Sequence, residues 1–199
     1  PDRLHEVEAI LVPSVAVRGE VLTLFPRVHL DRLHVIPEGV NPRWFRIPPP
    51  ARIEATLRRR EIKPPYLLAV GTLEPRKNYA RLFEAIAAWR REPTRATPLL
   101  VVVGRPGWGG VTLQKLCAQS RLDPRHVRWI PDADDDELLD LYAAARAVVV
   151  PSLWEGFGLP ALEAMAAAKP LVVSNLGALP EVVGDTAPTV GPHDAHDLL

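Results

Sequence analysis

The sequence predicts a doubly wound α/β fold built on a parallel β-sheet. Five short runs of apolar, mostly β-branched residues lie between positions 66 and 173, and amphipathic stretches with helical spacing alternate with them. Loops that contain glycine or proline join the two kinds of segment. Continuous apolar runs are typical of parallel strands buried on both faces, so the amphipathic stretches are expected to be their covering helices.

Each expected element follows from one of these patterns. The predicted strands of the sheet are residues 66–70, 99–103, 126–130, 147–150 and 170–173, and the predicted helices are residues 78–90, 111–120, 135–145 and 160–168. Upstream, residues 9–14 and 33–37 are apolar enough for strands, and residues 15–25 between them have helical character. The first part of the chain is therefore expected to form a small β-α-β unit.

A proline-rich connection follows that unit. Residues 38–52 contain four prolines, which exclude a regular helix or a central strand. We expect a domain boundary at about 47–50, with one domain over 1–47 and the other over 48–199. A helix is predicted at 51–62, and its three consecutive arginines, Arg58–Arg60, are interpreted as a solvated face or as a face toward a neighbouring domain.

Composition limits the function classes. An apolar fraction of 47% in 199 residues indicates a folded protein, and a formal net charge of zero gives no electrostatic reason to expect a nucleic-acid partner. No apolar run approaches the ~20 residues that a membrane-spanning helix needs. The single cysteine, Cys117, lies in a helical pattern and is interpreted as a packed, inert thiol.

The loop after the first strand of the sheet carries two cations. In parallel α/β sheets, ligands bind beyond the carboxyl ends of the strands, so the loops after residues 70, 103, 130 and 150 should line one crevice. Gly71 would let the backbone approach a ligand, and Asn78 is a candidate helix cap. Arg76 and Lys77 suit a diphosphate, although ordinary surface charges remain the alternative.

The loop after residue 150 is the most informative. Gly156 and Gly158 precede a helix with Pro160 in its first turn, and a helix N-terminus favours an anion such as phosphate. Seven residues separate Glu155 from Glu163, and a carboxylate accepts hydrogen bonds from two vicinal hydroxyls. The pattern indicates a nucleotide-sugar, with a hydroxyl-bearing ring on each side of a diphosphate; the alternative is one capping and one surface glutamate.

Several other motifs have both a functional and a simpler structural interpretation. The match of residues 156–161 to G-x-G-x-x-A is weak evidence for a dinucleotide, because the next strand ends in Ser174 rather than an acidic residue. The aspartates at 132 and 134 could hold a metal, yet acidic residues also favour a helix start, which is the preferred interpretation. His193 and His196 likewise favour a polar helix start over zinc. Trp108, in a glycine-rich loop, could stack on a base or pack on its own loop.

The motifs resemble a known family. The segments GTLEPRKN (71–78), VVVG (101–104) and PSLWEGFGLPALEAMAAAKPLVVSNLGALPEVVGD (151–185) resemble the C-terminal, nucleotide-sugar-binding domain of retaining glycosyltransferases of family 4. LHVIPEGVNPRWF (33–45) resembles the segment that leads into this domain from the acceptor domain. The resemblance covers residues 9–197 and implies a Rossmann-like half of a GT-B fold with a short remnant of the N-terminal domain, C-terminally truncated.

The resemblance also implies residue roles. Glu155 would bind hydroxyls of the donor sugar, and Glu163 those of the ribose. Lys77 matches the phosphate-binding lysine, whereas Thr72 stands where many members carry an arginine, so that Arg76 would compensate. The backbone of Phe157, Gly158 and Leu159 would lie near sugar and diphosphate, and the nucleobase near Ile130. Where the family usually has a glycine-containing turn, this chain has Ala168 and Lys169, a local departure without chemical effect.

The implied activity is that of a hexosyltransferase. It would transfer a sugar, with GDP-mannose the favoured donor, to an acceptor hydroxyl with retention and without a cofactor or metal. Arg76, Lys77 and Glu155 would be the catalytic residues, but the isolated chain would be inactive because the acceptor domain is missing. The expected location is cytoplasmic, with membrane contact only through the absent domain. A GT-B sugar-nucleotide epimerase or phosphorylase relative and a non-catalytic nucleotide-binding module are the alternatives.

Overall fold

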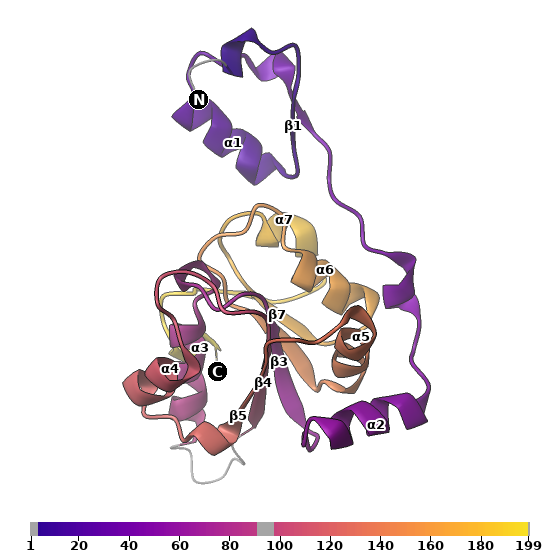
Figure 1. Ribbon diagram of the computed structural model, residues 1–199. Coiled ribbons are helices and arrows are strands. Elements are labelled where there is room, and N and C mark those ends of the chain that lie inside the picture. The colour runs from indigo at the N-terminus through magenta and orange to yellow at the C-terminus, as the bar shows by residue number, and fades with distance from the viewer. Residues whose placement is uncertain (1–3, 91–97, 199) are drawn as a thin grey trace.

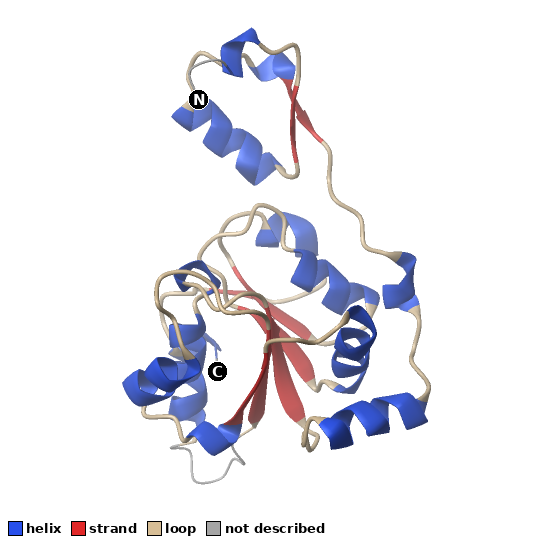
Figure 2. Ribbon diagram, in the orientation of Figure 1, coloured by secondary structure: helices blue, strands red, loops and turns tan. Residues whose placement is uncertain are grey.

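A six-stranded parallel sheet forms the centre of the molecule in the computed structural model, which describes residues 4–90 and 98–198 (Figures 1 and 2). Its strands are β3 (Tyr66–Val70), β4 (Leu99–Val103), β5 (Val127–Ile130), β6 (Ala147–Val150), β7 (Leu171–Ser174) and β8 (Thr189–Val190). They lie in the order β5-β4-β3-β6-β7-β8. The chain winds outward from β3 to β5, returns to β6 beside β3, and then winds the other way. This order confirms the doubly wound fold and puts its switch point between β3 and β6.

Helices cover both faces of the sheet, as Figure 2 shows. One apolar core joins the sheet to α2 (Pro50–Arg59), α5 (Asp135–Ala144), α6 (Leu159–Ala166) and α7 (Leu179–Val183), and a second joins it to α3 (Tyr79–Trp89) and α4 (Leu113–Ser120). Along β4, Val101 belongs to the first core and Val102 to the second, as expected for a strand buried on both faces. Cys117 is buried in the second core, as predicted.

Two elements were not predicted from the sequence. Helix α7 has only five residues, and β8 has two, so neither is long enough to show a periodic pattern. Strand β8 extends the sheet beyond β7, to which it pairs in parallel, and α7 lies between these two strands in the sequence.

The N-terminal residues form the predicted β-α-β unit. Strands β1 (Ile10–Val12) and β2 (Leu33–Val35) pair in parallel, and α1 (Val15–Leu24) lies between them in sequence. Val12, Val28 and Leu33 make a small core of their own. Figure 1 shows this unit apart from the large sheet and joined to α2 by the extended connection. The domain boundary at 47–50 stays a prediction.

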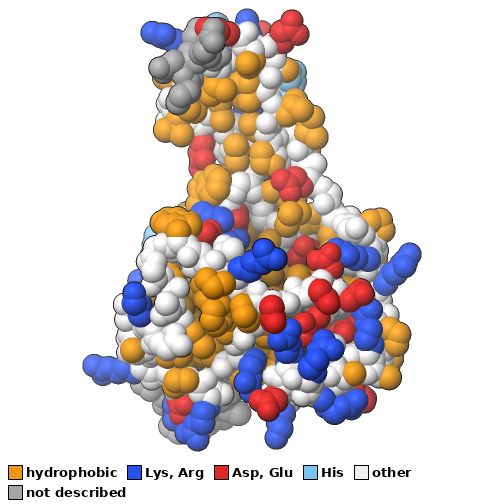
Figure 3. Space-filling view, in the orientation of Figure 1, with side chains coloured by type: hydrophobic (Ala, Val, Ile, Leu, Met, Phe, Trp, Pro, Cys, Tyr) orange, Lys and Arg blue, Asp and Glu red, His pale blue; other side chains and the backbone are white. Residues whose placement is uncertain are grey.

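The arginine-rich face of α2 packs against α5 through ion pairs. Arg59 and Arg60 both pair with Glu137, at 3.1 and 2.5 Å, and Arg52 lies 2.8 Å from the buried Asp140. Arg58 instead pairs with Glu54 of its own helix and is largely exposed. Arg58 and Arg59 are mostly exposed, as the solvated-face interpretation predicts, whereas Arg60 is only partly exposed where it pairs with Glu137. Basic and acidic side chains interleave on this side of the molecule in Figure 3.

The turn after α6 has a conformation that glycine usually adopts. Ala168 has a φ of 52°, in the left-handed region, although it carries a Cβ. The residue before it, Ala167, ends the helix with a φ of −79°. The turn thus forms although alanine stands where the family usually has glycine. Within the described ranges, no helix is long and apolar enough to cross a bilayer.

Candidate functional site

Three of the predicted site residues meet at the switch point between β3 and β6. Lys77 ends a short 3-10 turn after β3, and Glu155 lies in the loop after β6. The Lys77 ammonium donates to Oε1 of Glu155 over 2.7 Å, and Arg76 donates to Oε2 over 2.8 Å. Ser152 also donates to Oε1, over 2.7 Å. Two of the four loops that the sequence placed at one crevice, those after β3 and β6, are therefore held together by ion pairs.

Glu155 is ionised in this setting. It is buried, which opposes its charge, but the adjacent Lys77, Ser152 and Arg76 outweigh burial and hold the pKa of the carboxyl below its ordinary value. Arg76 is shared, because its guanidinium also pairs with the buried Glu74 at 2.6 Å. Two cations and two carboxylates thus form one hydrogen-bonded cluster. The sequence predicted the cations and Glu155 but not their mutual pairing, nor the part of Glu74.

Gly71 makes room for Lys77. Its φ is 146°, and a Cβ at this position would lie 2.8 Å from Cε of Lys77. The carbonyl of Gly71 accepts a hydrogen bond from the Tyr79 phenol over 2.7 Å. Thr72 is partly buried, and its carbonyl accepts from the backbone N–H of Glu74. The backbone carbonyls of Gly71 and Thr72 are therefore held by hydrogen bonds from Tyr79 and Glu74.

The helix that follows Glu155 begins as predicted. Gly158 is the N-cap of α6 with a φ of 106°, and Leu159 and Pro160 open its first turn. A Cβ on Gly158 would lie 2.6 Å from a methyl group of Leu179, so the position requires glycine for space as well as for conformation. Phe157 is partly buried, whereas Leu159 is 39% exposed. The N-terminus of α6 therefore lies next to the ion-paired cluster in sequence and opens at the surface.

Glu163 has a different environment from Glu155. Oε2 of Glu163 accepts a hydrogen bond from the Tyr142 phenol over 3.0 Å, and no cation pairs with it among the described residues. Burial raises the pKa of the carboxyl to about 7, against an ordinary value of 4.5. The two carboxyl groups thus differ in pKa. The pKa of Glu155 lies below its ordinary value, whereas that of Glu163 lies near neutral pH.

One candidate residue, Asn78, interacts differently from what its residue type indicated. Asn78 holds the N-cap position of α3, but its side chain does not cap the helix; its amide donates to the carbonyls of Pro151 and Pro192. The capping prediction was wrong because Asn78 has a left-handed φ of 58° and instead ties the β3 loop to the β6 loop. The Ile130 side chain is 1% exposed, and its carbonyl accepts from the Gly104 N–H.

The acidic loop after β5 starts a helix. The carboxylate of Asp134 accepts from the backbone N–H of Glu137 and caps α5, which confirms the helix-start interpretation. Asp132 lies 3.0 Å from Arg60. Trp108 is 64% exposed, so it does not pack fully on its own loop.

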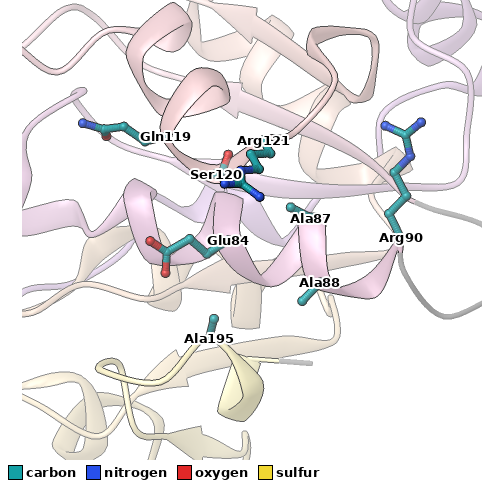
Figure 4. A pocket seen from close by; sticks show the side chains of 8 residues that line it. All are labelled: Glu84, Ala87, Ala88, Arg90, Gln119, Ser120, Arg121 and Ala195. Carbon is teal, nitrogen blue, oxygen red and sulfur yellow. The ribbon is translucent and has the colours of Figure 1, made fainter.

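A cavity on the outer side of α3 lies away from these residues. It measures about 720 Å³ and is bordered by α3, by the end of α4 and by Ala195. Figure 4 shows that the Arg90 side chain extends away from the other labelled groups. None of the predicted site residues lines this cavity. Its size alone is therefore no argument for a ligand site, and the ion-paired cluster remains the candidate.

The N-terminal unit contacts the same loop. Ser14 caps α1, and its hydroxyl also donates to the Gly156 carbonyl over 2.7 Å. The Trp154 indole donates to Glu20, and the Glu181 carboxylate accepts from the Val15 N–H over 2.9 Å. These contacts could not be predicted from the sequence, because partners 134 to 166 positions apart leave no local signal.

Comparison with known proteins identifies the family. The sequence model described as "Glycosyl transferases group 1" matches residues 54–198. The chain belongs to this glycosyltransferase family. It is 34% identical over 198 residues to MMP alpha-(1->4)-mannosyltransferase of Mycolicibacterium hassiacum, covering 98% of this chain and 44% of the relative. It is 44% identical over 131 residues to O-antigen chain mannosyltransferase B of Escherichia coli, covering 65% of this chain and 33% of the relative.

The solved structures of this glycosyltransferase class share the fold. A crystal structure of Anabaena HepE in complex with UDP-glucose aligns with a TM-score of 0.83 over 96% of this chain and 52% of that one, at 19% identity. The chain therefore has the architecture of one Rossmann-like half of a GT-B glycosyltransferase. It spans less than half of the length of the two curated relatives, which are therefore considerably longer than the chain described here.

Proposed function

We propose that this glycosyltransferase chain is the donor-binding half of a retaining hexosyltransferase. The observation that carries the proposal is the convergence of Arg76, Lys77 and Glu155 at the switch point, beside the loop that starts α6. Ligands of doubly wound folds bind at this point. GDP-mannose is the favoured donor, because two relatives are named as mannosyltransferases.

The chemistry is stabilisation of a leaving group. When the bond from the anomeric carbon to the diphosphate breaks, negative charge develops on the departing oxygen. Lys77, Arg76 and the N-terminus of α6 would meet that charge in a fixed arrangement, which lowers the barrier without a reorganisation of solvent. No metal is required in this scheme. Transfer to an acceptor would need the remainder of the protein, so the chain alone is proposed to bind the donor without transferring the sugar.

The two glutamates divide the recognition of hydroxyls. Glu155, held beside the cations, would accept from the sugar, and Glu163, four residues into α6, would accept from the ribose. Thr72, Phe157 and Leu159 would contribute backbone groups around the diphosphate, and Ile130 would border the base. The cytoplasmic location expected from the sequence stays a prediction.

Calorimetry with GDP, UDP and ADP, each with and without magnesium, tests the proposal. Binding of at least one diphosphate without magnesium is expected. If none binds, the donor-site assignment fails, and a requirement for magnesium would instead favour a metal at Asp132 and Asp134.

Isosteric variants test the division of labour. Glu163→Gln should weaken binding of the free diphosphate. Glu155→Gln removes the carboxylate that competes for Lys77, so affinity for the free diphosphate should hold or rise while affinity for the nucleotide-sugar falls. Equal losses in both variants would contradict the assignment. The second candidate function is a nucleotide-binding module without sugar recognition. In that case, each variant would bind the diphosphate and the nucleotide-sugar with equal affinity.

A further inference from the structure

The phenol of Tyr142 lies between two acceptors. Its oxygen is 3.0 Å from Oε2 of Glu163 and 3.1 Å from the carbonyl of Pro160. Tyr142 projects from α5, while both acceptors belong to α6. The contact therefore fixes the first turn of α6 and the Glu163 side chain against a neighbouring helix.

A phenol has one proton, so it cannot donate to both acceptors at once. When Glu163 is ionised, the phenol donates to Oε2. When Glu163 carries a proton, that carboxyl can donate to the phenol oxygen, and the phenol then donates to the Pro160 carbonyl. Both protonation states of Glu163 are satisfied, but the ionised carboxylate is the stronger acceptor for ligand hydroxyls, because hydrogen bonds to a charged acceptor are stronger than those to a neutral one.

The surroundings keep Tyr142 in place. Its ring is fully buried and meets the Trp44 ring edge to face, with centroids 5.0 Å apart. Two charged groups also act on Glu163: Asp135 of α5 disfavours the anion, and Arg43 of the connection favours it. Arg43 and Asp135 pair with each other at 2.5 Å, so their influences largely offset. The phenol is thus the strongest described partner that favours an ionised Glu163.

We propose that Tyr142 is the positioning residue of the donor site, whose phenol orients Glu163 and stabilises the ionised carboxylate that accepts the ribose hydroxyls. This inference rests on the proposed function, because it assigns a ligand to Glu163. Tyr142 itself does not touch the ligand. Its effect should therefore depend on whether the ligand has ribose hydroxyls.

The test compares a ribonucleoside diphosphate with its 2′,3′-dideoxy counterpart, which lacks both hydroxyls. The base is whichever of guanine, uracil and adenine binds best as the diphosphate. For the unaltered chain, the ribo form should bind more tightly. In Tyr142→Phe, this preference should fall roughly tenfold or more, the effect of losing one hydrogen bond to a charged group, while affinity for the dideoxy form stays the same.

Tyr66→Phe is the matched control. Tyr66 is equally buried in the same apolar core and donates to the Leu141 carbonyl, but the structure gives it no contact with Glu163. Its removal should leave the preference for the ribo form unchanged. Binding of the ribo form should weaken as pH falls, because Glu163 then takes up a proton. The midpoint of this loss should lie at higher pH in Tyr142→Phe, because the neutral carboxyl forms more easily without the phenol. In Tyr66→Phe the midpoint should not change.

The outcomes separate the two claims. If the unaltered chain does not distinguish ribo from dideoxy diphosphate, the role of Glu163 fails and the inference fails with it. If the unaltered chain distinguishes them and Tyr142→Phe weakens both ligands equally, only the inference fails, because Tyr142 is then merely structural.

A measurement on the unaltered chain covers the case in which Tyr142→Phe does not fold. The Cζ resonance of Tyr142, followed by NMR, should shift with pH at the same midpoint as the Glu163 carboxyl carbon, and the Cζ resonance of Tyr66 should not. Independent titration of the Tyr142 and Glu163 signals would overturn the inference.

Discussion

The Lys77 ammonium lies 2.7 Å from Oε1 of Glu155, and 78 positions of sequence separate the two residues. Lys77→Met removes the cation and leaves Glu155 buried beside Arg76 alone. We expect the free energy of unfolding, measured by urea titration at pH 7, to fall by about 3 kcal/mol, as for other broken buried pairs. The double variant Lys77→Met/Glu155→Gln should recover most of this loss. A loss of the same size in the Glu155→Gln background would show that the pair is not responsible.

The loss of stability caused by Lys77→Met should become smaller at acid pH. The pKa of Glu155 is held below its ordinary value in the folded protein, so the stability it contributes is present above the unfolded value of 4.5 and is lost as pH falls through the lower folded value. Urea titrations of the unaltered chain and of Lys77→Met should therefore converge as pH falls below about 4. Parallel curves over this range would contradict the assignment.

The contribution of Glu163 to stability should have the opposite dependence on pH. The unfolded carboxyl loses its proton near 4.5 and the folded one near 7, so the folded state binds more protons between these values and stability falls as pH rises. Glu163→Gln abolishes this fall. The variant should match the unaltered chain near pH 4 and exceed it by up to about 3 kcal/mol at pH 8. A stability difference between Glu163→Gln and the unaltered chain that does not change between pH 4 and pH 8 would contradict this assignment.

Ala168→Gly should stabilise the protein. The left-handed φ of 52° is unfavourable for alanine and open to glycine, so the exchange should add about 1 kcal/mol to the free energy of unfolding. Ala167→Gly is the matched control, because its φ of −79° suits alanine and glycine there should cost stability. Chemical denaturation of the two variants checks the signs; a loss in both would contradict the strain at Ala168.

Glu181 should hold the N-terminal unit. Its carboxylate accepts from the Val15 and Ala16 N–H groups at the start of α1, where no acidic residue of the helix itself is present. In Glu181→Ala, amide hydrogen exchange at these two residues should accelerate roughly fivefold, as for loss of about 1 kcal/mol of capping. Glu38→Ala, an exposed glutamate of the connection, removes the same charge and should leave the exchange rates unchanged.

The sequence predicted the elements that carry strong local patterns. The buried strands β3 to β7 and the start of α6 at Gly158 follow from runs and residue types that can be recognised without tertiary structure. Arg76, Lys77 and Glu155 were assigned to one crevice because the carboxyl ends of parallel strands share one edge of the sheet.

The interactions of those residues could not be predicted in the same way. That Lys77 neutralises Glu155, or that Tyr142 meets Glu163, depends on how loops and helices far apart in sequence pack together. Asn78 shows the limit most clearly. Its residue type favours a cap, but the tertiary contacts with Pro151 and Pro192 outweigh that local preference.

The cluster of Glu74, Arg76, Lys77 and Glu155 has two positive and two negative groups, so its formal charge is zero, as is that of the whole chain. An approaching diphosphate would gain no long-range attraction from a net charge on the cluster or on the chain. Capture would depend on exchange of partners at contact, with phosphate oxygens replacing carboxylates on the two cations. The association rate should accordingly vary little with ionic strength, unlike that of a site steered by excess positive charge.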